Sequence, residues 1–261
     1  MDSIAYRLLS LSGGSLGVVG RVAWSYAALI PEVVTVSTGL LASLALILVV
    51  FEMLEYGIRI VFLCLALDVV DGYLARKLGA VSERGEFLDR LFDRLYQVVV
   101  PAVLYAKYIY PSTLAIVYAT LIITISYWRL SRRVPTRECF AGLPLHVHTI
   151  LILASAFSGF PVPPELMLLL ALLSLIPLRY YRRSLRASPT SNQGTLWPLR
   201  LAVPLLLAIA PYEKISSVFM AIETVVLGYV ALGWVPFLVS EKGSIKNRLF
   251  YRSREDLYRL N

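Results

Sequence analysis

Long apolar segments separated by short polar links make up most of this sequence, and they restrict it to a membrane fold. Of its 261 residues, 58% are hydrophobic and 16% are charged, with a mean hydropathy of +0.70. This composition lies outside the usual range of soluble domains. A helix needs about 20 mostly apolar residues to cross a bilayer. The pattern therefore predicts an all-α integral membrane protein, a bundle of about eight transmembrane helices at residues 33–50, 58–74, 86–108, 111–128, 143–157, 163–179, 198–210 and 215–239.

The two ends of the chain differ from this apolar region. Residues 1–30 contain helix-like apolar patterns that are too short to cross a bilayer, so we expect an N-terminal interfacial segment there. Pro31 can open a helix, so we expect the transmembrane domain to cover residues 31–240. Residues 241–261 are rich in charged side chains and predict a charged cytoplasmic tail.

Lysine and arginine gather in alternate links between the apolar segments, as the positive-inside rule predicts. If the N-terminus is cytoplasmic, only Arg59, Lys107 and Lys214 fall on the outer side. This arrangement predicts an even number of spans and places both termini, together with the link between the second and third spans, at the cytoplasmic face. The formal net charge is +8, but its short clusters do not form the continuous basic face that nucleic-acid binding requires. We therefore expect no nucleic-acid partner.

Four aspartates lie where the second and third spans meet, although a charge at the centre of a membrane helix costs roughly 2.5 to 3.5 kcal/mol. They are Asp68, Asp71, Asp89 and Asp93. Clustered carboxylates favour hard cations such as Mg²⁺, Mn²⁺ or Ca²⁺, and Mg²⁺ is usually shared with the phosphates of a substrate. The aspartates therefore predict a divalent metal site, with ligands enough for two ions, and a phosphate-bearing substrate. Alternatively, one carboxylate can accept a proton from an attacking hydroxyl.

Helical spacing places these aspartates on two faces that also carry small residues. At about 100° per residue, one face of the second span carries Asp68, Asp71, Gly72 and Ala75. One stripe of the third span carries Gly85, Asp89 and Asp93. The short link of residues 77–84 favours antiparallel pairing, so the two faces can meet around a ligand. Ion pairs with neighbouring arginines would explain the charges but not this phasing.

The complete pattern Asp68-x2-Asp71-Gly72-x2-Ala75-Arg76-x8-Gly85-x3-Asp89-x3-Asp93 resembles the signature of the CDP-alcohol phosphotransferases. The resemblance implies a bundle of membrane helices, usually a homodimer, that transfers a phosphatidyl-type group from a CDP-linked lipid to an alcohol and releases CMP. It implies that the four aspartates bind two divalent ions, Mg²⁺ or Mn²⁺, and that Asp93 is the general base. It further implies that the nucleotide and its diphosphate bind at Asp68, Gly72, Ala75, Arg76 and Gly85.

Segments after the signature resemble the phosphatidylserine and archaetidylserine synthases within this family. Residues 100–102 (VPA) correspond to their Ala-Pro-Ala, and residues 140–144 (FAGLP) resemble their Phe-x-Gly-Leu-Pro. This resemblance implies serine as the acceptor alcohol. Arg129 and Arg133 are the candidates for binding the serine carboxylate, because arginine pairs well with that group.

Two alternatives stay open at this stage. Glu32, Ser131 and residues 145–148 depart from the serine-type pattern, so inositol phosphate or glycerol phosphate can be the acceptor in the same chemistry. From another class, a cation transporter or channel can hold an ion with four acids inside the membrane. Transporters often contain inverted repeats, and no second half of this sequence repeats the aspartate pattern.

Overall fold

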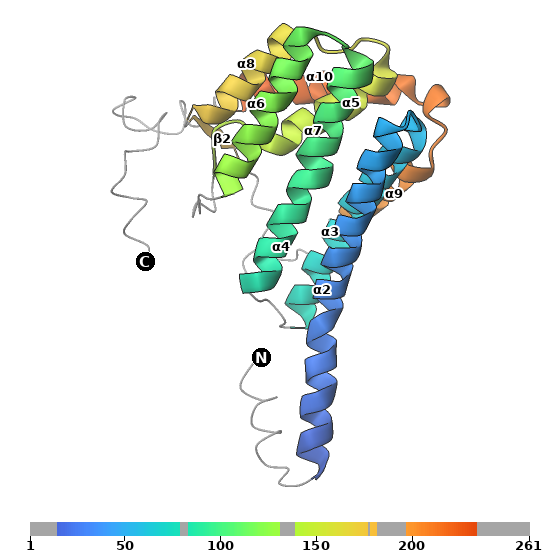
Figure 1. The fold of residues 1–261 in the computed structure, drawn as a ribbon, viewed down its shortest axis with the longest axis vertical. Helices are drawn as coiled ribbons and strands as arrows, with labels where there is room; N and C mark the ends of the chain where they lie inside the picture. Colours follow the sequence, from blue (N-terminus) through green and yellow to red (C-terminus); the bar gives the residue numbers. More distant parts are fainter. Residues whose placement is uncertain (1–14, 79–82, 131–138, 177, 182–196, 234–261) are drawn as a thin grey trace, which may run out of the picture.

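The computed structural model describes residues 15–78, 83–130, 139–176, 178–181 and 197–233 (Figure 1). The predicted charged tail at 241–261 lies outside these residues. The described helices are α2 (Ser15–Val50), α3 (Leu54–Lys77), α4 (Glu83–Arg94), α5 (Val100–Leu104), α6 (Thr113–Leu130), α7 (Leu145–Ser158), α8 (Pro164–Leu175), α9 (Trp197–Ile209) and α10 (Ser216–Leu232). A π-helical turn, η1 (Leu95–Val99), joins α4 to α5, and a second one, η2 (Tyr105–Ile109), continues the same helical run after α5. A 3₁₀ turn, η4 (Tyr212–Lys214), precedes α10.

Helices occur at all eight positions where the apolar segments predict them, but several of these helices are shorter than a membrane crossing needs. Two described helical stretches are long and apolar enough to cross a membrane, Pro31–Val50 within α2 and Thr113–Leu130 as α6. The apolar stretches in α7 to α10 are 10–17 residues long, which is shorter than the roughly 20 residues that a straight crossing needs. The helical architecture is thus confirmed, whereas the bundle of eight transmembrane spans stays a prediction.

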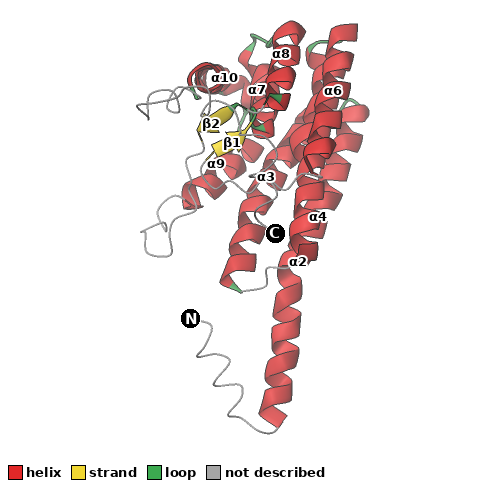
Figure 2. Ribbon diagram, turned by 90° about the vertical axis from the view of Figure 1, so that its left-hand side faces the viewer, coloured by secondary structure: helices red, strands yellow, loops and turns green. Residues whose placement is uncertain are grey.

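The sequence predicted that a helix begins at Pro31, but helix α2 begins earlier in the chain. It begins at Ser15 and continues through Pro31 to Val50, and its N-terminal part extends away from the other helices in both views (Figures 1 and 2). Proline removes one backbone donor from a helix, but the residues before it, 27–30 (AALI), include strong helix formers. The helix therefore continues across the boundary expected at residue 30.

Besides the helices, the described residues include a short two-stranded sheet of three residues in each strand. Strands β1 (Cys139–Ala141) and β2 (Arg179–Tyr181) pair antiparallel, with Phe140 opposite Tyr180 (Figure 2). Gly142 follows β1 at a φ of +77°, and a Cβ there would lie 2.5 Å from the Ser174 carbonyl oxygen. Its N–H donates to the Leu178 carbonyl at 2.8 Å. Only glycine fits this left-handed, crowded position, which explains the glycine in the FAGLP segment.

A buried polar chain fixes α7 beside two of its neighbours. His148 is buried on α7, with Nδ1 lying 3.1 Å from the Tyr118 hydroxyl on α6 and Nε2 lying 3.0 Å from Ser174 Oγ on α8. Buried polar groups are costly unless they are paired, so these contacts set the position of α7. The next residue, Thr149, donates a hydrogen bond to the backbone carbonyl of Gln97 in η1. Helix α7 therefore also supports the run that follows α4.

Helix α2 approaches α4 closely at Gly39, and this contact gives a stability prediction. A Cβ at Gly39 would lie 2.4 Å from the ring of Phe92 on α4. We expect Gly39→Ala to push the ring out of place and to lower stability by about 1 to 3 kcal/mol. The control is Gly228→Ala on α10, where an added Cβ meets nothing within 4 Å. Thermal unfolding in detergent should show a lower melting temperature for Gly39→Ala alone, and equal melting temperatures would contradict the close contact.

Candidate active site

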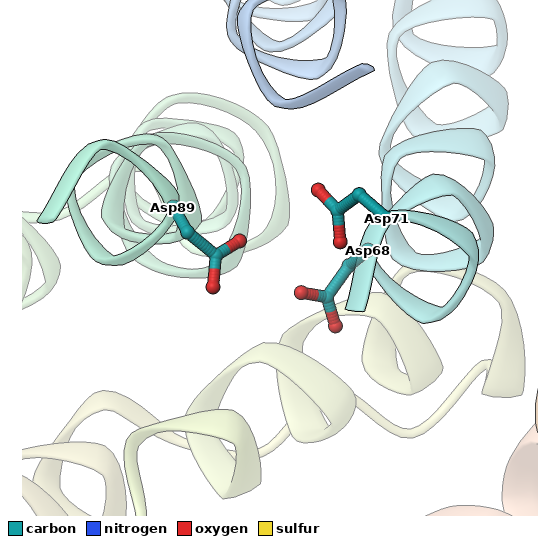
Figure 3. A group of neighbouring side chains, drawn as sticks. All are labelled: Asp68, Asp71 and Asp89. Carbon is teal, nitrogen blue, oxygen red and sulfur yellow. The ribbon is translucent and has the colours of Figure 1, made fainter. Parts of the chain in front are cut away.

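Carboxylates from two helices converge where the end of α3 faces α4. Asp68 and Asp71 extend from α3, and Asp89 extends from α4 toward them (Figure 3). Ligand oxygens of the three side chains all lie within 4.8 Å of one another. Asp71 is buried, whereas Asp68 and Asp89 are half-buried. The face of α3 with Asp68 and Asp71 therefore lies opposite the stripe of α4 with Asp89, as the helical spacing predicted.

Three carboxylates at this separation fit a divalent cation. Metal–oxygen distances are 2.0–2.1 Å for Mg²⁺ and 2.3–2.6 Å for Ca²⁺, so two oxygens on one ion lie at most about 4 to 5 Å apart. Small rotations of the three side chains would bring one oxygen of each onto a single ion. No histidine or cysteine of the described residues belongs to the group, and an all-oxygen set suits Mg²⁺ or Mn²⁺ better than zinc or copper.

Asp93 lies one helical turn after Asp89 but is not part of this three-carboxylate group. Its Oδ1 accepts a hydrogen bond from the Tyr96 hydroxyl at 2.6 Å. Tyr96 belongs to η1, the π turn that begins immediately after α4. Single π turns inside helices often occur at functional sites. The structure thus gathers three of the four predicted metal ligands and holds the fourth against a tyrosine, so a metal-binding role for Asp93 stays a prediction.

Helix α2 contributes a residue that the sequence patterns did not single out. Thr35 is buried, and its Oγ1 lies 3.2 Å from Asp71 Oδ2 and 3.0 Å from the Pro31 carbonyl. Neighbouring hydroxyls in the same helix only bond to backbone, as Ser37 does to Val33. A serine or threonine in an apolar segment therefore does not by itself indicate a site residue. Only the packing of α2 against α3 shows that Thr35, unlike Ser37, contacts an aspartate.

The comparison with known proteins agrees with this site. The family model described as CDP-alcohol phosphatidyltransferase matches residues 28–234. The chain belongs to this family. Members of the family are membrane-embedded and use divalent metals, and membership implies a CDP-linked substrate and an alcohol acceptor. The family predicted from the aspartate signature is thereby confirmed.

A curated relative gives a finer but partial comparison. The chain is 30% identical over 125 residues to a CDP-diacylglycerol–serine O-phosphatidyltransferase from Methanocaldococcus jannaschii. The aligned region covers 46% of this chain and 61% of that relative. The match therefore spans less than two thirds of the relative's length.

The small residues of the family signature lie beside the aspartates. Gly72 and Ala75 occupy the last turns of α3 and are half-buried, and Gly85 is half-buried in the first turns of α4. The side chain of Arg76 lies outside the described part of the structure.

Among the predicted acceptor residues of this phosphotransferase, the structure describes Arg129 but not Arg133, which lies outside the described residues. Arg129 is half-buried at the end of α6, and its Nη1 donates to the Leu143 carbonyl at 2.9 Å. A second arginine, Arg94, follows Asp93 directly, and its buried Nε has no hydrogen-bond partner among the described residues.

Proposed function

We propose that this phosphotransferase transfers a phosphatidyl or archaetidyl group from a CDP-linked lipid to the hydroxyl of serine and releases CMP. The observation that carries the chemistry is the convergence of Asp68, Asp71 and Asp89 within 4.8 Å, in a chain of the CDP-alcohol phosphatidyltransferase family. The serine-transferring relative supports serine over inositol phosphate and glycerol phosphate.

The aspartates on α3 and α4 provide the metal site in this proposal. Asp68, Asp71 and Asp89 hold a divalent cation, Mg²⁺ or Mn²⁺, and two ions are bound if Asp93 also contributes an oxygen. Such a cation neutralises a diphosphate and stabilises the charge of a leaving phosphate. The nucleotide and diphosphate lie along Gly72, Ala75 and Gly85, and Arg76 adds a positive charge toward the phosphates.

Asp93 acts as the general base of the transfer. It removes the proton of the serine hydroxyl, and the serine oxygen then forms a bond to the lipid-side phosphorus. The bond from this phosphorus to the bridging oxygen breaks, and CMP leaves with that electron pair. A positioned base of this kind contributes about 10²- to 10⁴-fold to a rate.

Arginines near the cytoplasmic end of α6 are the proposed binding residues for serine. A guanidinium holds a carboxylate through two parallel N–H donors. The bond from Arg129 to the Leu143 carbonyl orients this side chain just before the start of α7, and Arg133 follows four residues later in the sequence. The positive-inside pattern supports placing this region, both termini and the aspartates at the cytoplasmic face. We further expect a homodimer of about eight-span subunits, as the family resemblance implies.

An acceptor screen tests this proposal. Purified protein is given CDP-diacylglycerol or CDP-archaeol, Mn²⁺ and either serine, inositol phosphate or glycerol phosphate, and CMP release is measured. We expect CMP release with serine to be at least about tenfold faster than with the two phosphates. A site whose arginines pair with a carboxylate rejects a substrate without that group, because its charges are then left unpaired. Labelled serine should appear in the lipid fraction.

The Arg129→Gln variant sharpens the same screen. It should require more serine for half-maximal rate while the need for CDP-lipid stays unchanged, because it removes a charge on the acceptor side alone. Faster turnover with inositol phosphate or glycerol phosphate than with serine would refute the serine assignment. Cation flux through proteoliposomes without CMP release would refute the enzyme proposal as a whole.

A further inference from the structure

Arg94, at the end of α4, has a guanidinium whose hydrogen bonds are incomplete in the described part of the chain. Its Nε is buried and has no hydrogen-bond partner among the described residues. The side chain as a whole is half-buried, so the rest of the guanidinium is not enclosed in the core. A buried donor without a partner is costly, and more so when the group is charged. Such a group in a native structure calls for a specific explanation.

A second arginine lies near this one on the neighbouring helix. Helix α4 packs against α6, and Arg129 lies in the last turn of α6. The positive charge of Arg94 acts on Arg129, and Arg90 adds to the positive charge around Arg94 while Asp93 offsets part of it. Arginine does not relieve such repulsion by releasing its proton, because it stays charged in proteins. An excess of positive charge therefore remains between α4 and α6.

The N-terminus of α7 is a third positive feature at this place. Arg129 Nη1 donates to the Leu143 carbonyl at 2.9 Å, just before α7 begins. Pro144, at the N-cap of α7, provides no side-chain cap for the first N–H groups of this helix. A helix N-terminus attracts anions through its free N–H groups and its dipole. The space near Arg94 and Arg129 is therefore suited to an anion.

We propose that Arg94 and Arg129 form one anion site that holds the carboxylate of the acceptor, and that Arg94 is a specificity-determining residue of the transfer. This inference rests on the proposed function, which supplies the acceptor. Arg94 lies directly beside the aspartate site in the sequence, so the anion must be close to the hydroxyl that reacts. Serine meets this condition, because only its α and β carbons separate the two groups. The bound carboxylate pairs with both guanidiniums and offsets their repulsion.

A comparison of serine with serinamide tests the role of Arg94, because serinamide has an uncharged amide in place of the carboxylate. CMP release is measured with each acceptor. For Arg94→Gln, we expect the ratio of kcat/KM for serine to that for serinamide to fall about 10- to 100-fold, since hydrogen bonds between charged groups are lost for serine alone. KM for CDP-lipid should stay nearly unchanged. Arg94→Lys keeps the charge but not the planar fork, so its ratio should lie between those of Arg94→Gln and the wild-type protein.

Lys214→Gln is the control, because it also removes one positive charge. Lys214 is exposed in η4. The neighbouring Tyr212 ring lies against Arg59 of α3, toward the opposite end of that helix from the aspartates. This variant should keep the wild-type preference for serine over serinamide.

Thermal unfolding in detergent, with a chelator present, tests the site without turnover. Serine should raise the melting temperature of the wild-type protein, because a ligand that binds only the folded state stabilises it, and it should not raise that of Arg94→Gln. Without serine, Arg94→Gln should melt no lower than the wild-type protein, because it removes one of two charges that repel each other. A lower melting temperature would indicate a structural role and overturn the inference. If Arg94→Gln does not fold, Arg94→Lys carries the same comparisons.

The outcomes distinguish this inference from the proposed function. An unchanged ratio for serine and serinamide in Arg94→Gln, or an equal loss with both acceptors, would overturn the role of Arg94. If the wild-type protein transfers only to glycerol phosphate or inositol phosphate, serine is the wrong acceptor. The anion site is then supported if Arg94→Gln raises KM for that phosphate about tenfold or more, and refuted if it does not. If the wild-type protein releases no CMP with any acceptor, the proposed function fails, and the melting temperatures with serine and glycerol phosphate decide the anion site alone.

Discussion

Asp93→Asn is expected to lower kcat for CMP release by about 10²- to 10⁴-fold, the usual contribution of a general base. The amide has the shape of the carboxyl group, and its oxygen can still accept the hydrogen bond from Tyr96. The variant therefore removes the proton acceptor and leaves the surrounding contacts in place. Binding of CDP-lipid should persist, because the three-carboxylate group does not include Asp93.

Glu223→Gln is the matched control for this prediction. Glu223 is a buried carboxylate on α10, and its Oε1 accepts a hydrogen bond from Ser155 at 3.2 Å. The Glu223→Gln variant makes the same change from carboxylate to amide at a position outside the site. The kcat of this variant should therefore equal that of the wild-type protein. Single-turnover measurements of CMP release and equilibrium binding of CDP-lipid distinguish the two variants. An Asp93→Asn protein with wild-type kcat would exclude Asp93 as the base.

Removal of the metal is expected to abolish CMP release, and Mn²⁺ or Mg²⁺ should restore it. Asp71→Asn should lower Mn²⁺ affinity by more than about tenfold, because Asp71 is a member of the three-carboxylate group. Even a residue that only orients a metal ligand typically contributes 10- to 100-fold to metal affinity.

Thr35→Val should weaken Mn²⁺ binding by about tenfold, since the Thr35 hydroxyl donates a hydrogen bond to Asp71. Chelator titration and Mn²⁺ binding measure these effects.

Thr38→Val provides the control for the threonine variant. Thr38 is buried in the same helix, but its hydroxyl donates to the Val34 carbonyl at 2.9 Å and not to an aspartate. It should bind Mn²⁺ as the wild-type protein does. CMP release that continues in excess chelator, or wild-type Mn²⁺ affinity in Asp71→Asn, would show that the three aspartates hold no essential metal.

Local spacing explains why so much of this site was predictable. Asp68 and Asp71 share a helix face because residues three apart are neighbours in any α-helix, and Asp89 lies on a stripe of the next helix for the same reason. The link between the two helices is short, so antiparallel pairing brings the faces together. These relationships depend on regular helix geometry alone, and the structure bears them out for the three aspartates.

Positions that depend on neighbours far apart in the chain were predicted less well. Pro31 is a plausible helix start by itself, yet α2 runs through it because the preceding residues continue the helix. The sheet of β1 and β2 joins segments about 40 residues apart, and no local periodicity indicated it. The eight predicted spans depend on helix length, and the apolar stretches of the described helices α7 to α10 are 10–17 residues long, fewer than the roughly 20 that a straight crossing needs.

By itself, the sequence determined the family and the aspartates that carry the chemistry, because a helical signature is a local pattern whose geometry follows from residue spacing. Only the tertiary structure decided which side chain of another helix reaches the aspartates. Helix packing brings Thr35 to Asp71. This contact joins two helices and residues 36 apart in the sequence, so no spacing within one helix encodes it.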